Sequence, residues 1–176
     1  MKHTTALLLI LFLCFKGISQ CAIKPEYSDD RSYISYTTEV ESLYVNEDLE
    51  NGYSEVAFHF TVQKSSSDFK AFRYYLQVIS VFGSGKRLPI PRTIVFNNSK
   101  VVNANSKMKT TYYRTSTIES CLFELSLDDI MWYRNNDISS MKIEDPVEQM
   151  SISFPINGRK VNNQANCTLN IIKGGQ

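Results

Sequence analysis

His59 is the first residue to consider for chemistry, because it is the one histidine outside the first twenty residues. In a serine or cysteine hydrolase, a histidine must lie close to the nucleophile and to a carboxylate. The Gly-x-Ser-x-Gly turn, which presents the nucleophile in one large class of hydrolases, does not occur in the chain. One histidine and scattered cysteines also fall short of a zinc site. We therefore predict a non-enzymatic protein with no cofactor and no metal.

Two other patterns look like ligand sites, but each has a simpler explanation in local structure. Residues 83–86, Gly-Ser-Gly-Lys, lack the spacing of a phosphate-binding loop and precede prolines rather than a helix. Asp128 and Asp129 suit the first turn of a helix, where the helix dipole favours acidic side chains. Glu144 and Asp145 suit a solvated turn, since no calcium-loop spacing surrounds them. We assign these residues structural roles.

Aromatic side chains on the solvent side of predicted elements are the best candidates for binding. Strand alternation predicts that Tyr75 points away from the core together with His59 and Arg73, and it predicts the same for Tyr113. Trp132 falls in a predicted short helix. Aromatic rings stack on sugars and anchor protein partners. These five residues form the predicted binding face of a structural or interaction module, and a carbohydrate- or ligand-binding module that uses the aromatic residues is the alternative.

A predicted hairpin positions three of these residues. Apolar side chains alternate with polar or smaller ones over residues 55–63, and residues 72–82 show the same period of two. The polar link at residues 65–68 lets the two runs fold back as an antiparallel pair. Its inward face is predicted to form the centre of the core, with Val56, Phe58, Phe60, Val62, Phe72, Tyr74, Leu76, Val78 and Phe82.

The same alternation predicts most of the remaining chain. Further strands are expected over residues 32–44, with an interruption near Ser42, and over residues 92–96, 107–115, 118–127, 138–143 and 148–156. Residues 22–31 read as a polar entry arm. Residues 88–91, Leu-Pro-Ile-Pro, read as an edge or crossover, because proline supplies no strand donor.

Two segments favour helix instead. Ser126 is a good N-cap for a short helix over residues 127–134. At the end of the chain, Val161, Ala165, Leu169 and Ile172 recur at helical spacing and favour a helix over residues 158–173, with a strand over residues 166–172 as the alternative. The predicted fold is mainly β, an antiparallel β-sandwich of about seven to nine strands with one short helix and a C-terminal helix.

Residues 1–20 have the organisation of a signal peptide. Lys2 and His3 form a basic head, and the apolar run that follows, residues 6–15, is too short to cross a bilayer. Residues 21–176 then form a single domain, and the loss of Lys2 and Lys16 changes the formal net charge from +1 to −1. No basic stripe indicates nucleic acid, and no membrane span is predicted. We expect a secreted or periplasmic protein whose partner is an unknown protein or glycan at the cell envelope.

Three cysteines remain after this removal, namely Cys21, Cys121 and Cys167. Export favours a disulfide, and an odd number leaves one thiol over. Cys21 stands where an outer-membrane lipoprotein would carry its lipid, although Gln20 replaces the small residue that such a signal requires. With a lipid on Cys21, the pair left is Cys121 with Cys167. Without it, we favour Cys21 with Cys167.

The chain resembles a type of small exported bacterial β-sandwich protein of uncharacterised function. The resemblance rests on Ile18-Ser19-Gln20-Cys21, the short-helix segment at residues 125–130, the strand segment at residues 141–144, and Asn166-Cys167. It covers the whole chain as a pattern. The resemblance implies a terminal helix and a Cys21–Cys167 bridge with Cys121 free, and it implies no activity.

Overall fold

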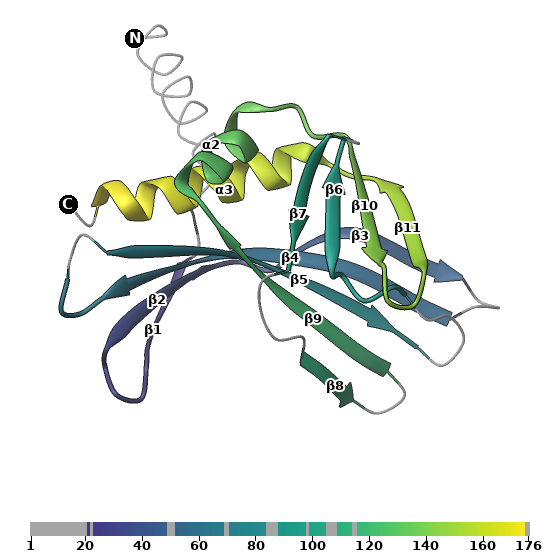
Figure 1. Cartoon of the computed structure of the whole chain (residues 1–176), viewed down its shortest axis with the longest axis horizontal. Helices are drawn as coiled ribbons and strands as arrows, with labels where there is room; N and C mark the ends of the chain where they lie inside the picture. Colours follow the sequence, from purple (N-terminus) through teal and green to yellow (C-terminus); the bar gives the residue numbers. More distant parts are fainter. Residues whose placement is uncertain are drawn as a thin grey trace, which may run out of the picture.

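The computed structural model describes residues 21, 23–48, 52–68, 71–83, 88–97, 99–104, 109–113 and 116–174. In this part of the chain, two antiparallel sheets and two helices pack in layers (Figure 1). The protein is therefore mainly β, an antiparallel sandwich with a short helix and a C-terminal helix, as predicted. The described residues contain eleven strands, more than the seven to nine that we expected.

The larger sheet has seven strands in the order β1-β2-β4-β5-β9-β8, with β3 also paired to β4. Because β4 is long, its first half pairs with β3 and its second half with β2. The strands are β1 Ile23–Tyr27, β2 Tyr33–Thr38, β3 Glu41–Asp48, β4 Gly52–Ser65, β5 Phe72–Phe82, β8 Lys109–Tyr113 and β9 Ser116–Leu125.

The smaller sheet and the helices cover one face of the larger sheet (Figure 1). We call this covered face the inner face and the opposite one the outer face. The smaller sheet has the order β11-β10-β6-β7, with β6 Thr93–Phe96, β7 Lys100–Asn103, β10 Ser140–Asp145 and β11 Met150–Pro155. The helices are α2 Leu127–Asn135 and α3 Gly158–Gly174.

Both helices form where the sequence predicts them. Ser126 accepts a hydrogen bond from the Asp129 amide at 3.1 Å, and the Asp129 carboxylate accepts one from the Ser126 amide at 2.8 Å. This reciprocal capping box satisfies two backbone donors at the start of α2. In α3, the apolar residues at helical spacing are buried against the larger sheet: Val161, Ala165, Leu169 and Ile172.

The hairpin of β4 and β5 is the centre of the core, as predicted. Phe58 lies opposite Val78, and Phe60 lies opposite Leu76. These four side chains are at most 1% exposed. Tyr133 of α2 packs edge-on against Phe60, with ring centroids 5.6 Å apart. The aromatic pattern of the hairpin therefore joins the larger sheet to its helical cover.

The entry-arm prediction was wrong, and two other local predictions gain detail. Residues 23–27 form β1 rather than part of an arm, because an edge strand tolerates Pro25. Residues 88–91 lie on the crossover from β5 in the larger sheet to β6 in the smaller sheet, as predicted, and Leu88 and Ile90 are buried in the core. The interruption predicted near Ser42 takes two forms: the chain breaks between β2 and β3 at residues 39–40, and the register shifts between Ser42 and Tyr44.

Gly158 begins α3 at a point where the backbone of another segment leaves no room for a side chain. A Cβ atom at this position would lie 1.9 Å from the carbonyl oxygen of Ile138. The segment is held there by the Ile156 amide, which donates to the Ser139 carbonyl at 2.9 Å. Glycine is thus required for α3 to start against the segment that leads into β10.

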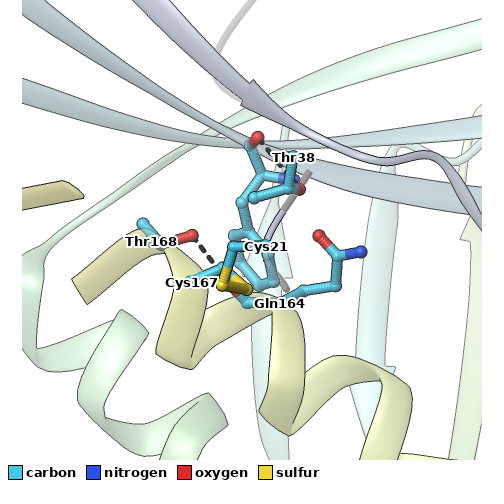
Figure 2. The surroundings of a disulfide bond; sticks show 6 residues. Cys21, Thr38, Gln164, Cys167 and Thr168 are labelled. Carbon is cyan, nitrogen blue, oxygen red and sulfur yellow. Dashed lines mark hydrogen bonds between the residues drawn. A yellow bond between two sulfur atoms is a disulfide. The ribbon is translucent and has the colours of Figure 1, made fainter. Parts of the chain in front are cut away.

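A disulfide joins Cys21, just before β1, to Cys167 in α3 (Figure 2). The Cα atoms are 5.5 Å apart, which suits a disulfide, and this is the pairing that the resemblance implied. Thr38 and Thr168 lie beside it in Figure 2. Because the Cys21 sulfur is bonded to Cys167, the same sulfur cannot carry a thioether-linked lipid. A lipid on Cys21 is therefore incompatible with this structure.

Candidate binding site

Three of the predicted binding residues share the outer face of the larger sheet. His59 lies opposite Gln77, and Tyr75 and Arg73 follow on β5 opposite Thr61 and Gln63 of β4. Their side chains differ in accessibility, since Arg73 is exposed, Tyr75 is half-buried and His59 is buried. The exposed functional group on this stretch is therefore the Arg73 guanidinium.

The other two predicted residues do not join this set. Trp132 belongs to α2, on the inner side of the sheet, where its ring meets Tyr133 edge-on at 5.5 Å and the Lys100 ammonium lies 5.8 Å from its centroid. The side chain of Tyr113 lies outside the described residues. The described aromatic candidates thus stand on opposite sides of the larger sheet.

His59 does not have the surroundings of a catalytic base. It is 8% exposed, and burial lowers the pKa of its imidazole, although a hydrogen bond with Gln77 acts in the opposite direction. Cys121, a free thiol, lies opposite Val78 on the inner face. The sheet therefore separates His59 from this thiol, and burial raises the Cys121 pKa to about 11, which keeps the thiol protonated and unreactive.

A cleft of about 430 Å³ opens on the outer face beside Arg73. It lies where the β4–β5 turn meets the β1–β2 turn. Its lining comes from both turns and from the ends of three strands: Ser32, Tyr33, Gln63, Ser65, Ser67, Ala71 and Arg73. Apart from Ala71, every one of these side chains offers a hydrogen-bonding group.

Hydrogen bonds between the two turns fix the floor of this outer cleft. The Ser66 amide donates to the Ser32 carbonyl at 2.9 Å, and the Ser66 hydroxyl donates to the Arg31 carbonyl at 2.7 Å. Within the β1–β2 turn, Asp30 accepts from the Ser28 hydroxyl and the Ser32 amide, which lowers its pKa to about 2. Asp30 is therefore ionised at neutral pH and holds the turn in shape.

A second groove, of about 340 Å³, opens on the inner face of the same sheet end. It lies between the strands and the last turns of α3, whose disulfide to Cys21 fixes the helix beside β1. Its lining includes more aromatic and aliphatic residues than that of the outer cleft: Ile23, Pro25, Tyr36, Lys64, Phe72, Asn170 and Ile171.

We call this part of the sheet the open end, defined as β1, β2 and residues 63–65 and 72–74. Alternation places Arg73 toward the outer cleft and Phe72 toward the inner groove. Sequence reasoning identified Arg73 but missed the partners that line both cavities. The polar residues 65–68 predicted the turn of the hairpin. No local pattern in the sequence predicts that this turn contacts the β1–β2 turn.

Glu144 and Asp145 are the last two residues of β10, so the prediction of a solvated turn was wrong, although their role is structural. The buried Asp145 carboxylate accepts from the Val147 amide at 3.1 Å and pairs with Arg92, whose Nε lies 3.0 Å away. Asp129 pairs with Lys100 and caps α2. Among the residues that the structure describes, no group of three or more His, Cys, Asp or Glu side chains is placed to hold a metal ion.

No helix within the described part of the chain is long and apolar enough to cross a membrane. Comparisons of the chain with protein-family models, with curated proteins and with solved structures found no match.

Proposed function

We propose that this protein is an exported, non-enzymatic interaction module that binds its partner at the open end of the larger sheet. The observation that carries the proposal is that one sheet end bears a cleft on each of its two faces, both formed by side chains of β2, β4 and β5. Export is supported by the signal-like first twenty residues and by a disulfide, which persists in oxidising compartments. The periplasm or cell surface of a bacterium fits both features.

Arg73 is the group that would recognise the partner in the outer cleft. Its side chain is exposed, and its guanidinium carries five donors in a planar fork. Tyr33, 39% exposed, and the hydroxyls of Ser65 and Ser67 lie along the same cleft. This set favours a partner that presents carboxylates or other acceptors rather than an apolar surface.

Site-specific photo-crosslinking tests the proposal in living cells. A benzophenone amino acid replaces Tyr33 in the outer cleft, and in a matched control it replaces Val147, which is 71% exposed in the β10–β11 turn. We expect a discrete adduct from position 33, reduced severalfold when Arg73→Ala is added, and no adduct at position 147. Absence of an adduct at position 33, or the same adduct at both positions, would contradict the proposal.

The thermal midpoint of each variant is measured in parallel. Because Arg73 is exposed, Arg73→Ala should change the free energy of unfolding by no more than about 0.5 kcal/mol. Loss of the adduct in a stable variant then reports binding rather than misfolding.

A further inference from the structure

β1 is the outermost strand at the open end of the described sheet, and its side chains contribute little to the core (Figure 1). Of its five residues, Ile23 is half-buried and the other four are exposed, and none of the five belongs to the buried core. The inner groove, lined by Ile23 and Pro25 of β1 and by Asn170 and Ile171 of α3, lies between this strand and the helix. Pairing with β2 and the disulfide at Cys21 are therefore the main attachments of β1.

The turn that follows β1 shows which of its amides face β2. The Ser28 amide donates to the Tyr33 carbonyl at 3.1 Å. Because donors alternate along an antiparallel pair, the amides of Lys24 and Glu26 also point to β2, while position 25 points to the free edge. Proline has no amide hydrogen, so Pro25 removes the central donor that a further strand would need. β1 is thus a poor edge for another strand to join.

β2 lacks the features that protect β1. Its sequence, Tyr33–Thr38, contains no proline and no charged side chain, and its aromatic and β-branched residues favour a strand. By the same alternation, the backbone groups of Ser35 and Thr37 face β1. A row of unpaired backbone groups of this kind accepts a strand from another chain. β1 therefore covers an edge that could itself take up a strand.

Removal of β1 would leave β2 in place. β2 pairs with β4 over five residues, and the Phe60 amide donates to the Thr38 hydroxyl at 3.0 Å. The Ser66 amide, which donates to the Ser32 carbonyl at 2.9 Å, holds the turn before β2. In protein that begins at Cys21, β1 is instead a chain end with few buried contacts, and such ends open locally when nothing ties them down. The disulfide supplies this tie.

We propose that β1 is a strap that the Cys21–Cys167 disulfide holds closed, and that opening of this bond lets β2 accept an extended strand in place of β1. A dithiol opens the bond by thiol–disulfide exchange. The S–S bond breaks, Cys21 and Cys167 become thiols, and the dithiol supplies two electrons and two protons and leaves as a disulfide. The incoming strand has the chemistry of β1, with apolar side chains at alternate positions toward the inner face. This inference goes beyond the proposed function, because it concerns the edge of β2 rather than either cavity.

Amide hydrogen exchange measured by NMR tests whether the strap opens. When the parent protein is reduced with dithiothreitol, exchange of the Ser35 and Thr37 amides should rise at least about tenfold, because both face β1. The Ile34 and Tyr36 amides face β4 and should change less. This alternation distinguishes release of β1 from general loosening of the sheet. Equal changes in all four amides, or no change at Ser35 and Thr37, would overturn the inference.

Capture of a peptide tests whether the edge of β2 accepts a strand. The acceptor is the full chain with Cys21→Ser and Cys167→Ser, which remove the disulfide. It also carries Glu26→Pro, which removes an amide that faces β2 and so weakens competition from the chain's own strand. The probe is a fluorescein-labelled peptide with the sequence of residues 22–28. Fluorescence anisotropy should show binding to this acceptor with a Kd between micromolar and millimolar, and no binding to the disulfide-bonded parent protein.

Two variants of the peptide serve as matched controls for the register. Pro25→Ala in the peptide should bind about as tightly as the original sequence, because this position faces away from β2. Glu26→Pro in the peptide should bind at least about tenfold more weakly, because it removes a donor to β2. Equal binding of the two variants would overturn the inference. So would failure of the original peptide to bind an acceptor whose β5 and β9 amides remain protected. If the acceptor does not fold, the exchange pattern of the reduced parent protein decides the question.

Discussion

The β4–β5 hairpin has two halves that share one sequence pattern but have different environments. In the covered half, Phe58 and Phe60 are at most 1% exposed beneath the helices and the smaller sheet. In the open end, Phe72 lies on the same face at the same period of two, yet it is only half-buried. Alternation therefore tells which side a ring faces, while the extent of the covering layer decides whether that ring is core or binding surface.

The largest expected effect contrasts one ring from each half. Phe58→Ala should lower the free energy of unfolding by about 3–5 kcal/mol, because it leaves a cavity in a tightly packed core. Phe72→Ala should cost about 1 kcal/mol, because its ring is already partly in contact with water. Urea unfolding of the two variants measures both values. Equal losses would show that the open end is packed like the rest of the core.

The disulfide links the open end, through Cys21 just before β1, to α3, one of the helices that cover the inner face. The bonded cysteines are 146 residues apart, and the chain-entropy model gives a stabilisation of about 5 kcal/mol for such a loop, with about 2–4 kcal/mol typical of measured values. The double variant Cys21→Ser with Cys167→Ser should lose stability in this range. Amide exchange should rise more in β1 and β2 than in β5 and β9. Reduced parent protein should match the double variant, and unchanged exchange in β1 would contradict the assigned role.

The residue at which α3 begins determines how this helix packs on the inner face of the larger sheet. Gly158→Ala places a methyl group against the Ile138 carbonyl, so either the helix or the segment before β10 must move. Overpacking of this kind costs about 1–3 kcal/mol. Asn163→Ala, at an exposed position of the same helix, is the control and should be close to neutral. A parent-like melting midpoint for Gly158→Ala would mean that the segment relaxes at no cost.

A smaller effect is expected at the cap of α2. Ser126→Ala removes the side-chain acceptor for the Asp129 amide and should cost about 1 kcal/mol. Ser153→Ala on β11, where the hydroxyl is exposed, provides the comparison. This loss should appear in the free energy of global unfolding, because Tyr133 of α2 packs in the core and α2 therefore unfolds together with it. A loss no larger than that of Ser153→Ala would show that water replaces the cap.

The sequence predicts the strands, the helices and their inward faces, because these depend on local periodicity. It does not predict contacts between segments that are far apart in the chain. The alternation around Phe58 and Val78 indicated both strands and their inward faces, and the spacing of Val161 and Ala165 indicated α3. It could not indicate that the Ser66 amide would meet the Ser32 carbonyl, because that contact joins two separate turns. Both cavities arise from such contacts, so Arg73 could be singled out while its neighbours in the cleft could not.

His59, on the outer face of the hairpin, is a further case in which alternation alone did not determine burial. Alternation predicted that its side chain would be exposed, whereas the structure shows that it is buried. Its pKa in the folded protein lies below the ordinary value of 6.5, because burial disfavours the imidazolium. The free energy of unfolding should therefore be at its full value above pH 6.5 and should decrease as the pH falls below that value. The reason is that the imidazole binds a proton at a higher pH in the unfolded chain than in the folded one. Urea unfolding between pH 7.5 and pH 5 should show this loss in the parent protein and a reduced loss in His59→Gln.

The same titration can be followed directly by NMR. In protein that begins at Cys21, His59 is the one histidine, so its ring resonances report a single midpoint, which should lie below 6.5. Asp30 does not interfere, because its pKa of about 2 lies outside this range of pH. A midpoint at or above 6.5 would mean that the imidazole is solvated, and the outer face around Gln77 would then be open to a partner. A lower midpoint leaves Arg73 and its cleft as the accessible polar feature of this face, because a neutral, covered imidazole offers a ligand neither charge nor surface.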